Sequence, residues 1–154
     1  MRYFKNYELN RFTEYPSRHT LTEEEIIEMG QRWDPQPFHV DAELAKDSMF
    51  GGLVASSSHL FCIACRLGND VPDEMRSAAE SALGFEKLQW HAPARPGDTL
   101  RVTSTVIERR ESNSRPHLGI VTCDNHILNQ RDEVVFSYQG AFLVRKEPSE
   151  ADAE

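Results

Sequence analysis

The chain has 154 residues, with 17 lysine and arginine residues against 25 aspartate and glutamate residues, so its formal net charge is −8. This length suits one domain with a sizeable hydrophobic core. The acidic balance argues against a nucleic-acid-binding protein and against docking on anionic membranes, because both need a basic surface.

The sequence also predicts a reducing, cytoplasmic environment. No apolar run approaches the length of about 18 residues that a membrane-spanning helix requires. Residues 1–8 lack the apolar core of a secretory signal peptide. The chain has three cysteines, an odd number, which favours free thiols over a disulfide framework.

The first 15 residues are expected to form an N-terminal arm, because they mix charges with aromatic side chains and show no clear period. This arm would pack on the body of the protein or on a partner subunit. Residues 22–25 are Thr-Glu-Glu-Glu, a capping box that predicts a helix ending near residue 32. Residues 33–37 contain two prolines and predict an irregular loop.

A short helical stretch is expected over residues 41–45, before Gly51 and Gly52 interrupt the pattern. Residues 53–67 form the most apolar segment, with apolar side chains almost all the way round. They predict a buried helix that ends at Gly68, where a glycine commonly follows a helix.

Strand patterns dominate the rest of the chain. Strands are expected over residues 83–90, 99–107, 118–127 and 133–144. Helices followed by antiparallel strands make an α+β layout in which the buried helix covers one face of the sheet. We expect a single domain over residues 16–146 and an acidic, solvated tail over residues 147–154.

The strongest chemical signal is the pair Asp34 and His39 on the proline-containing loop. Prolines stiffen the backbone, so the two side chains can be held in one geometry at low entropic cost. A carboxylate and an imidazole that share one water form a general acid/base pair. The alternative is that Asp34 caps a helix and His39 is an ordinary loop histidine.

A second signal is Gly52 with Ser56, Ser57 and Ser58 before the apolar helix. The start of a helix offers unpaired N–H donors and the positive end of its dipole, which suit an oxyanion or a carbonyl oxygen. Ordinary capping by serine is the alternative explanation.

These motifs carry a resemblance to a known family. The pattern Asp34-x-Gln36-Pro37-x-His39-x-Asp41, with residues 50–55 after it, resembles the (R)-specific enoyl-CoA hydratase and MaoC-like dehydratase family. Residues 90–100 are similar to a hairpin found in hot-dog proteins generally. The resemblance implies a hot-dog fold, in which an antiparallel sheet wraps a long apolar helix. It also implies a homodimer joined edge to edge and an acyl-CoA or acyl-carrier-protein thioester as substrate.

The resemblance further implies a lyase of fatty acid metabolism. Asp34 and His39 would activate a water for addition to C3 of a trans-2-enoyl thioester, with dehydration as the reverse reaction. Gly52 and the backbone around Ser56, Ser57 and Ser58 would bind the substrate. Neither a metal nor a cofactor is expected.

The sequence differs from the family pattern at two positions. Gln36 stands where the family has asparagine, and Ser57 stands where it has glycine. The side chain of Ser57 would restrict the approach of a thioester to the backbone. Two alternatives stay open: a hot-dog thioesterase on the same fold, and a non-catalytic acyl-CoA-binding subunit, which crowding by Ser57 would favour.

Three further residues of the apolar helix attract notice. Cys62 and Cys65 form a CxxC motif, which we interpret as two small apolar side chains because no second pair exists. His59 is expected to be packed and hydrogen-bonded, with a place in an acyl pocket as the alternative.

Overall fold

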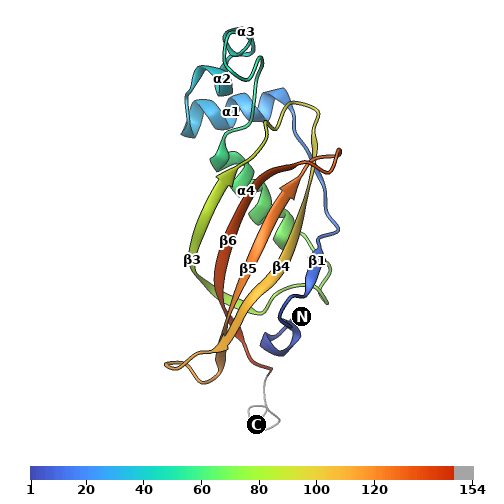
Figure 1. Cartoon of the computed structure of the whole chain (residues 1–154), viewed down its shortest axis with the longest axis vertical. Coiled ribbons are helices and arrows are strands. Elements are labelled where there is room, and N and C mark those ends of the chain that lie inside the picture. Colours follow the sequence, from blue (N-terminus) through green and yellow to red (C-terminus); the bar gives the residue numbers. More distant parts are fainter. Residues whose placement is uncertain (148–154) are drawn as a thin grey trace.

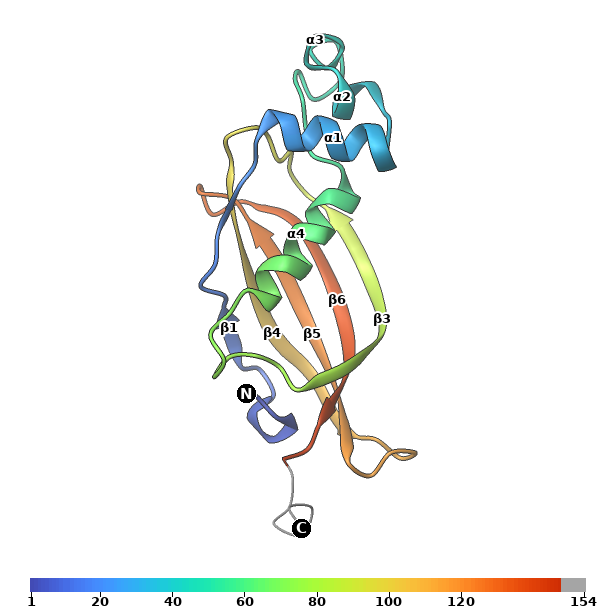
Figure 2. The same cartoon turned by 180° about the vertical axis from the view of Figure 1, so that it is seen from behind.

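The computed structural model describes residues 1–147. Six antiparallel strands form one sheet in the order β1-β4-β5-β6-β3, with the short β2 beside β4. Helix α4 (Ser57–Asn69) lies along one face, and the sheet curves around it (Figures 1 and 2). This is the predicted hot-dog fold. The strands are β1 (Phe12–Glu14), β2 (His19–Thr20), β3 (Ala79–Trp90), β4 (Thr99–Glu111), β5 (Leu118–Leu128) and β6 (Val134–Arg145).

The core lies between α4 and the inner face of the sheet. Leu60, Ile63 and Leu67 of α4 recur every three or four residues and belong to one buried cluster with side chains of β4, β5 and β6. The opposite face of α4 is exposed, and Cys62 and Cys65 lie on the surface rather than in the core. The expectation of a helix buried on nearly all sides was therefore wrong.

The bounds of α4 also differ from the prediction. Residues 53–56 are not helical, because the Val54 and Ala55 amides donate to the carbonyls of Phe38 and Ala94. Ser56 is the N-cap, and the helix then continues through Gly68 to Asn69. Apolar residues before a helix can thus belong to an extended connection that is paired with its neighbours.

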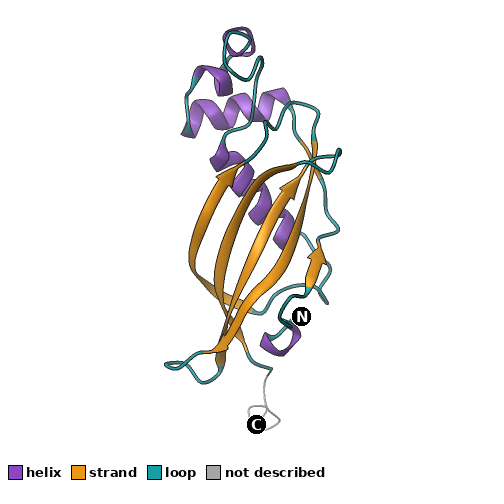
Figure 3. Cartoon of the chain, viewed as in Figure 1, coloured by secondary structure: helices purple, strands orange, loops and turns teal. Residues whose placement is uncertain are grey.

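Three helices gather at one end of the sheet (Figure 3). They are α1 (Glu23–Trp33), α2 (Pro37–Val40) and α3 (Ala42–Ala45). The Thr22 side chain accepts from the Glu25 amide, as the capping box predicted. Helix α2 replaces part of the predicted loop, because a proline is well suited to the first position of a helix.

The N-terminal arm packs on the body of its own chain. It contains a 3₁₀ turn, η1 (Phe4–Asn6), and strand β1, which pairs with β4. Phe4 and Tyr7 are buried in a second apolar cluster, where the Phe4 ring occupies the space above Gly119. The predicted acidic tail lies almost wholly outside the described residues. No helix of residues 1–147 is both long and apolar enough to cross a membrane.

Candidate active site

Asp34 and His39 meet at the helical end of the sheet. Asp34 follows α1 as its C-cap, and His39 is the third residue of α2. Asp34 Oδ2 lies 3.6 Å from His39 Nε2. This separation is long for a direct hydrogen bond but short enough for one water to contact both atoms. The Asp34 side chain is 39% exposed and that of His39 only 9%, so the pair faces outward from a packed base.

One hydrogen bond of the imidazole orients the His39 ring. His39 Nδ1 lies 2.6 Å from the backbone oxygen of Val54. A carbonyl oxygen only accepts, so Nδ1 carries a hydrogen, and Nε2 is the ring nitrogen that faces Asp34. The Val54 carbonyl therefore fixes the orientation of the ring and turns Nε2 toward the carboxylate.

Close packing of α1 on α2 brings the two side chains together. A Cβ on Gly30 would lie 2.6 Å from the His39 carbonyl oxygen and 3.0 Å from the His39 Cβ. Phe38 packs edge to face against His39 and against Phe50, and Phe50 does so against Trp90 of β3. Gly30 and this row of aromatic rings hold α2 between α1 and the sheet.

Helix α4 begins close to this pair. Its N-cap, Ser56, lies two residues after Val54, whose backbone oxygen contacts His39 Nδ1. Ser56 is buried, and its Oγ accepts from the His59 amide and contacts Ser58 Oγ. Ser57 and Ser58 are exposed, and the geometry of a helix leaves the amides of its first turn without intrahelical acceptors. Ser56 thus caps the helix, and the backbone amides of Ser57 and Ser58 lie in the first turn, where an external oxygen can accept from them.

Gly52 lies apart from the first turn of α4. It belongs to the loop between α3 and α4, where a Cβ on Gly52 would lie 3.3 Å from Arg95 Nη1. Arg95 Nη2 also donates to the Phe50 carbonyl oxygen at 2.6 Å, which holds this loop in place. The structure therefore brings Asp34, His39 and the three serines to one end of the sheet, with Gly52 on the adjoining loop.

A cluster of His19, Glu25 and His59 escaped the sequence analysis. Glu25 Oε1 lies 2.6 Å from His19 Nε2 and 3.5 Å from His59 Nε2. His59 is buried, and its Nδ1 has no hydrogen-bond partner within the described part of the chain. Burial lowers the pKa of His59, against the effect of Glu25 and in the same direction as that of His19. These residues come from three separate segments, and no local pattern links them.

The described residues show no cluster of histidine, cysteine and carboxylate side chains that could hold a metal ion. Burial raises the pKa of the Cys65 thiol, so this cysteine is not an activated nucleophile.

Comparison with known proteins adds to this geometry. The family model described as mesaconyl-CoA hydratase matches residues 2–154. A mesaconyl-CoA hydratase of Haloarcula hispanica is 32% identical over 126 residues, which are 80% of this chain and 34% of that protein. One of Cereibacter sphaeroides is 42% identical over 86 residues, which are 56% of this chain and 24% of that protein. The chain thus spans only a quarter to a third of these relatives.

A solved structure matches over its whole length. The crystal structure of the MaoC-like dehydratase from Rhodospirillum rubrum has a TM-score of 0.87 and 36% sequence identity. The match covers 97% of this chain and 100% of that one.

Proposed function

The chain belongs to the mesaconyl-CoA hydratase family of MaoC-like proteins, and from that premise we propose that it is a hydro-lyase acting on an acyl-CoA thioester. It would add water across C2 and C3 of an enoyl thioester or remove water from the 3-hydroxyacyl thioester. The observation that carries this proposal is the 3.6 Å separation of Asp34 Oδ2 and His39 Nε2 beside the first turn of α4.

The pair would hold and activate the water. A water bound between Asp34 Oδ2 and His39 Nε2 can give up a proton to this pair while its oxygen attacks C3. The C2–C3 double bond is consumed, and the dyad delivers a proton to C2. One O–H bond therefore breaks while a C3–O bond and a C2–H bond form.

The amides of Ser57 and Ser58 would stabilise the charge of this reaction. Attack at C3 moves negative charge to the thioester oxygen, so donors aimed at that oxygen bind the transition state more tightly than the substrate. The first turn of α4 supplies both free N–H groups and the positive end of the helix dipole. Proton transfer and oxyanion binding then need neither metal nor cofactor.

Mesaconyl-CoA is a natural first substrate to test, because the relatives carry that name. Hydration should be followed as loss of the absorbance of the conjugated thioester, for mesaconyl-CoA and for the four-carbon crotonyl-CoA. Asp34→Asn and His39→Ala should each lower kcat by about 100-fold or more, in line with the usual contribution of general acid–base catalysis.

The chain offers a matched control for these variants. Asp124 and His126 form another Asp/His pair, with Oδ2 and Nε2 3.1 Å apart, on partly exposed positions of β5. Asp124→Asn and His126→Ala should keep full activity. Normal turnover by Asp34→Asn and His39→Ala would refute the assignment. Release of free CoA thiol without hydration would favour the thioesterase, and binding without turnover would favour the acyl-CoA-binding subunit.

We further propose that two copies of the chain pair along β3. This strand ends the sheet, and all of its twelve residues are exposed. Its large apolar side chains Leu83, Phe85, Leu88 and Trp90 are 36–51% exposed. A long apolar edge strand is a ready template for another strand, and a second β3 would cover it.

A reducing compartment remains our prediction for this protein. Cys62, Cys65 and Cys123 are free thiols, which supports a cytoplasmic location.

A further inference from the structure

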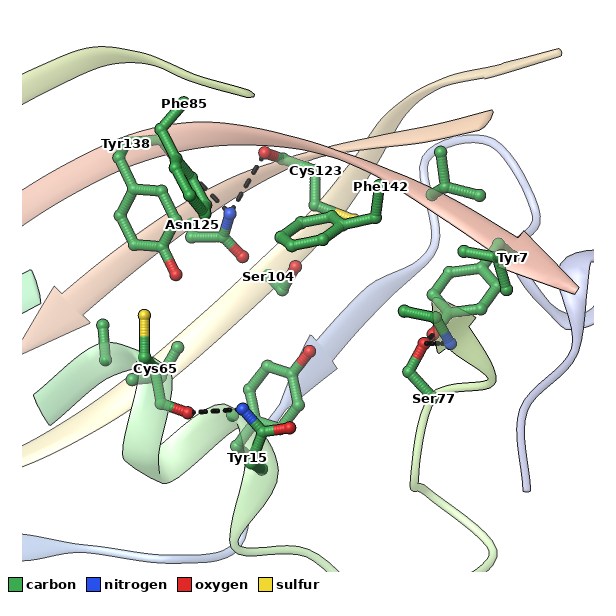
Figure 4. Close-up of a pocket in the computed structure, with 17 residues that line it drawn as sticks. Tyr7, Tyr15, Cys65, Ser77, Phe85, Ser104, Cys123, Asn125, Tyr138 and Phe142 are labelled. Atoms are coloured by element: carbon green, nitrogen blue, oxygen red, sulfur yellow. Dashed lines mark hydrogen bonds between the residues drawn. The ribbon is translucent and has the colours of Figure 1, made fainter. Parts of the chain in front are cut away.

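The face of the sheet that points away from α4 carries a polar groove that the proposed chemistry does not use. Tyr138 and Phe142 of β6 point into a cavity against α4 (Figure 4), so Ser137 and Gln139, which alternate with them, face the other side of the sheet. The groove on that side has a volume of about 330 Å³. Its lining includes Lys87 and His91 of β3, Asp124 and His126 of β5, and Ser137 and Gln139 of β6. We call it the outer groove.

A bulge in β3 turns Lys87 toward the outer groove. Glu86 lies opposite Gln139 of β6. Gln89 lies opposite Ser137, so β3 contains one extra residue between these two pairs. Without that residue the alternation of the strand would turn Gln89 toward α4. Lys87 adopts a φ of 51° at the bulge, a left-handed conformation that lysine rarely takes and that occurs preferentially at functional positions.

Lys87 is also the one lysine of the chain that has no carboxylate partner among the described residues. Lys5, Lys46 and Lys146 each form an ion pair with a glutamate. The chain as a whole is acidic, with a formal net charge of −8. The ammonium group of Lys87 is thus a free positive charge at the outer groove.

Polar groups of the neighbouring strands surround this charge. Ser137 Oγ lies 2.7 Å from His91 Nε2. Asp124 is the acidic residue of the lining, and each of its oxygens has a nitrogen partner there. Its Oδ2 lies 3.1 Å from His126 Nε2, and its Oδ1 accepts from Gln139 Nε2 at 3.4 Å. The groove therefore combines an ammonium group with imidazoles, a hydroxyl and amides, a set that suits an anion with several acceptor oxygens.

We propose that the outer groove binds a phosphate group, with Lys87 as its charged partner. Phosphate presents acceptor oxygens in several directions, and a lysine ammonium group binds it as a point charge. The volume of the groove is typical of small-molecule sites, so it has room for the organic part of a phosphate ester. Free phosphate and a phosphate ester share this chemistry, and the test distinguishes them.

Pairing of two copies along β3 would leave this site open. Strand pairing uses the backbone groups at the edge of a sheet, whereas side chains project from its two faces. The site also involves neither Asp34 nor His39, so it is independent of the proposed hydration chemistry.

The test is calorimetric titration of the whole chain with sodium phosphate, at an ionic strength held constant with sodium chloride. Lys87→Asn removes the charge and keeps the bulge, because asparagine accepts a positive φ more readily than lysine. Its affinity for phosphate should fall at least about tenfold, the usual contribution of a hydrogen bond to a charged group. Lys87→Arg keeps the charge and should retain most of the affinity. Lys87→Gly replaces the asparagine variant if that protein does not fold, since glycine adopts a positive φ without strain.

Two further variants are matched controls. Lys46→Gln removes a lysine that is already paired with Glu43, and the affinity for phosphate should not change. Asp124→Asn removes the negative charge of the described lining and should strengthen phosphate binding, because it removes a repulsion. A wild-type protein that does not bind phosphate, or a folded Lys87→Asn protein with unchanged affinity, would overturn the proposal.

AMP and adenosine distinguish the two sources of the phosphate group. AMP that binds more tightly than inorganic phosphate, and loses affinity in Lys87→Asn, would identify a phosphate ester as the ligand. AMP that binds no more tightly than phosphate would identify free phosphate. Adenosine that binds as well as AMP would show that the phosphate group is not recognised, against the proposal. None of these measurements requires turnover, so the result does not depend on the hydratase assignment.

Discussion

Replacing Gly30 with alanine should disable the candidate active site while leaving the protein folded. The added Cβ would lie 3.0 Å from both the carbonyl carbon and the Cβ of His39. Carbon atoms in contact settle at about 3.5–4.0 Å, so the backbone of α2 has to move by roughly 0.5–1 Å. This shift would move His39 and change the distance between its Nε2 and Asp34 Oδ2.

The change in stability should be small because two effects oppose each other. Overpacking of this kind costs about 1–3 kcal/mol of unfolding free energy. An alanine in place of a glycine inside α1 returns about 1 kcal/mol through helix propensity. Activity should respond more strongly, since a displacement near 1 Å at a reacting group can cost about 100-fold in rate.

The assay is kcat/KM on crotonyl-CoA together with urea unfolding. Gly68→Ala is the matched control, because a Cβ there meets no atom within 4 Å. It should raise stability slightly and keep the turnover of short thioesters. A Gly30→Ala protein with wild-type kcat/KM would show that the contact between α1 and α2 does not position His39.

Three other variants address separate features of the structure. Ser57→Gly should raise kcat/KM by about tenfold, part of the 100-fold or more that an oxyanion donor is worth, because it removes the Cβ beside a first-turn amide. Ser57→Ala keeps that Cβ and should give no gain, so equal rates in all three proteins would contradict the expectation. His59→Leu should reduce the loss of stability in acid. Burial in the folded protein lowers the pKa of His59 below its ordinary value of about 6.5. As the pH falls through that value, the unfolded chain binds a proton at His59 that the folded protein does not, so the wild type loses stability. Urea unfolding at pH 5 and pH 7 measures this loss, and an identical difference in wild type and variant would exclude the effect. Leu88→Lys places a charge on the free edge of β3 and should convert the dimer to a 17.6 kDa monomer in sedimentation equilibrium. A monomeric wild type or a dimeric variant would refute pairing along β3.

The parts of the fold that depend on local periodicity could be predicted from the sequence. The alternation of β5 between buried and half-buried residues repeats the pattern of its apolar residues, and the capping contact of Thr22 is present. The proximity of Asp34 and His39 could also be predicted, because they lie within six residues and the prolines around them limit the backbone; their catalytic role stays a prediction. Such features need information from only a few neighbouring positions.

Features that depend on distant contacts could not be predicted. Residues 53–55 are as apolar as the helix that follows, yet the Val54 amide donates to the Phe38 carbonyl and the Ala55 amide to the Ala94 carbonyl, which keeps this segment extended. The packing of the N-terminal arm depends on a distant contact that no local pattern reveals. Phe4 occupies the space above Gly119, more than a hundred positions away in the sequence. His59 was expected to be packed and hydrogen-bonded; it is buried, but its Nδ1 has no hydrogen-bond partner among the described residues.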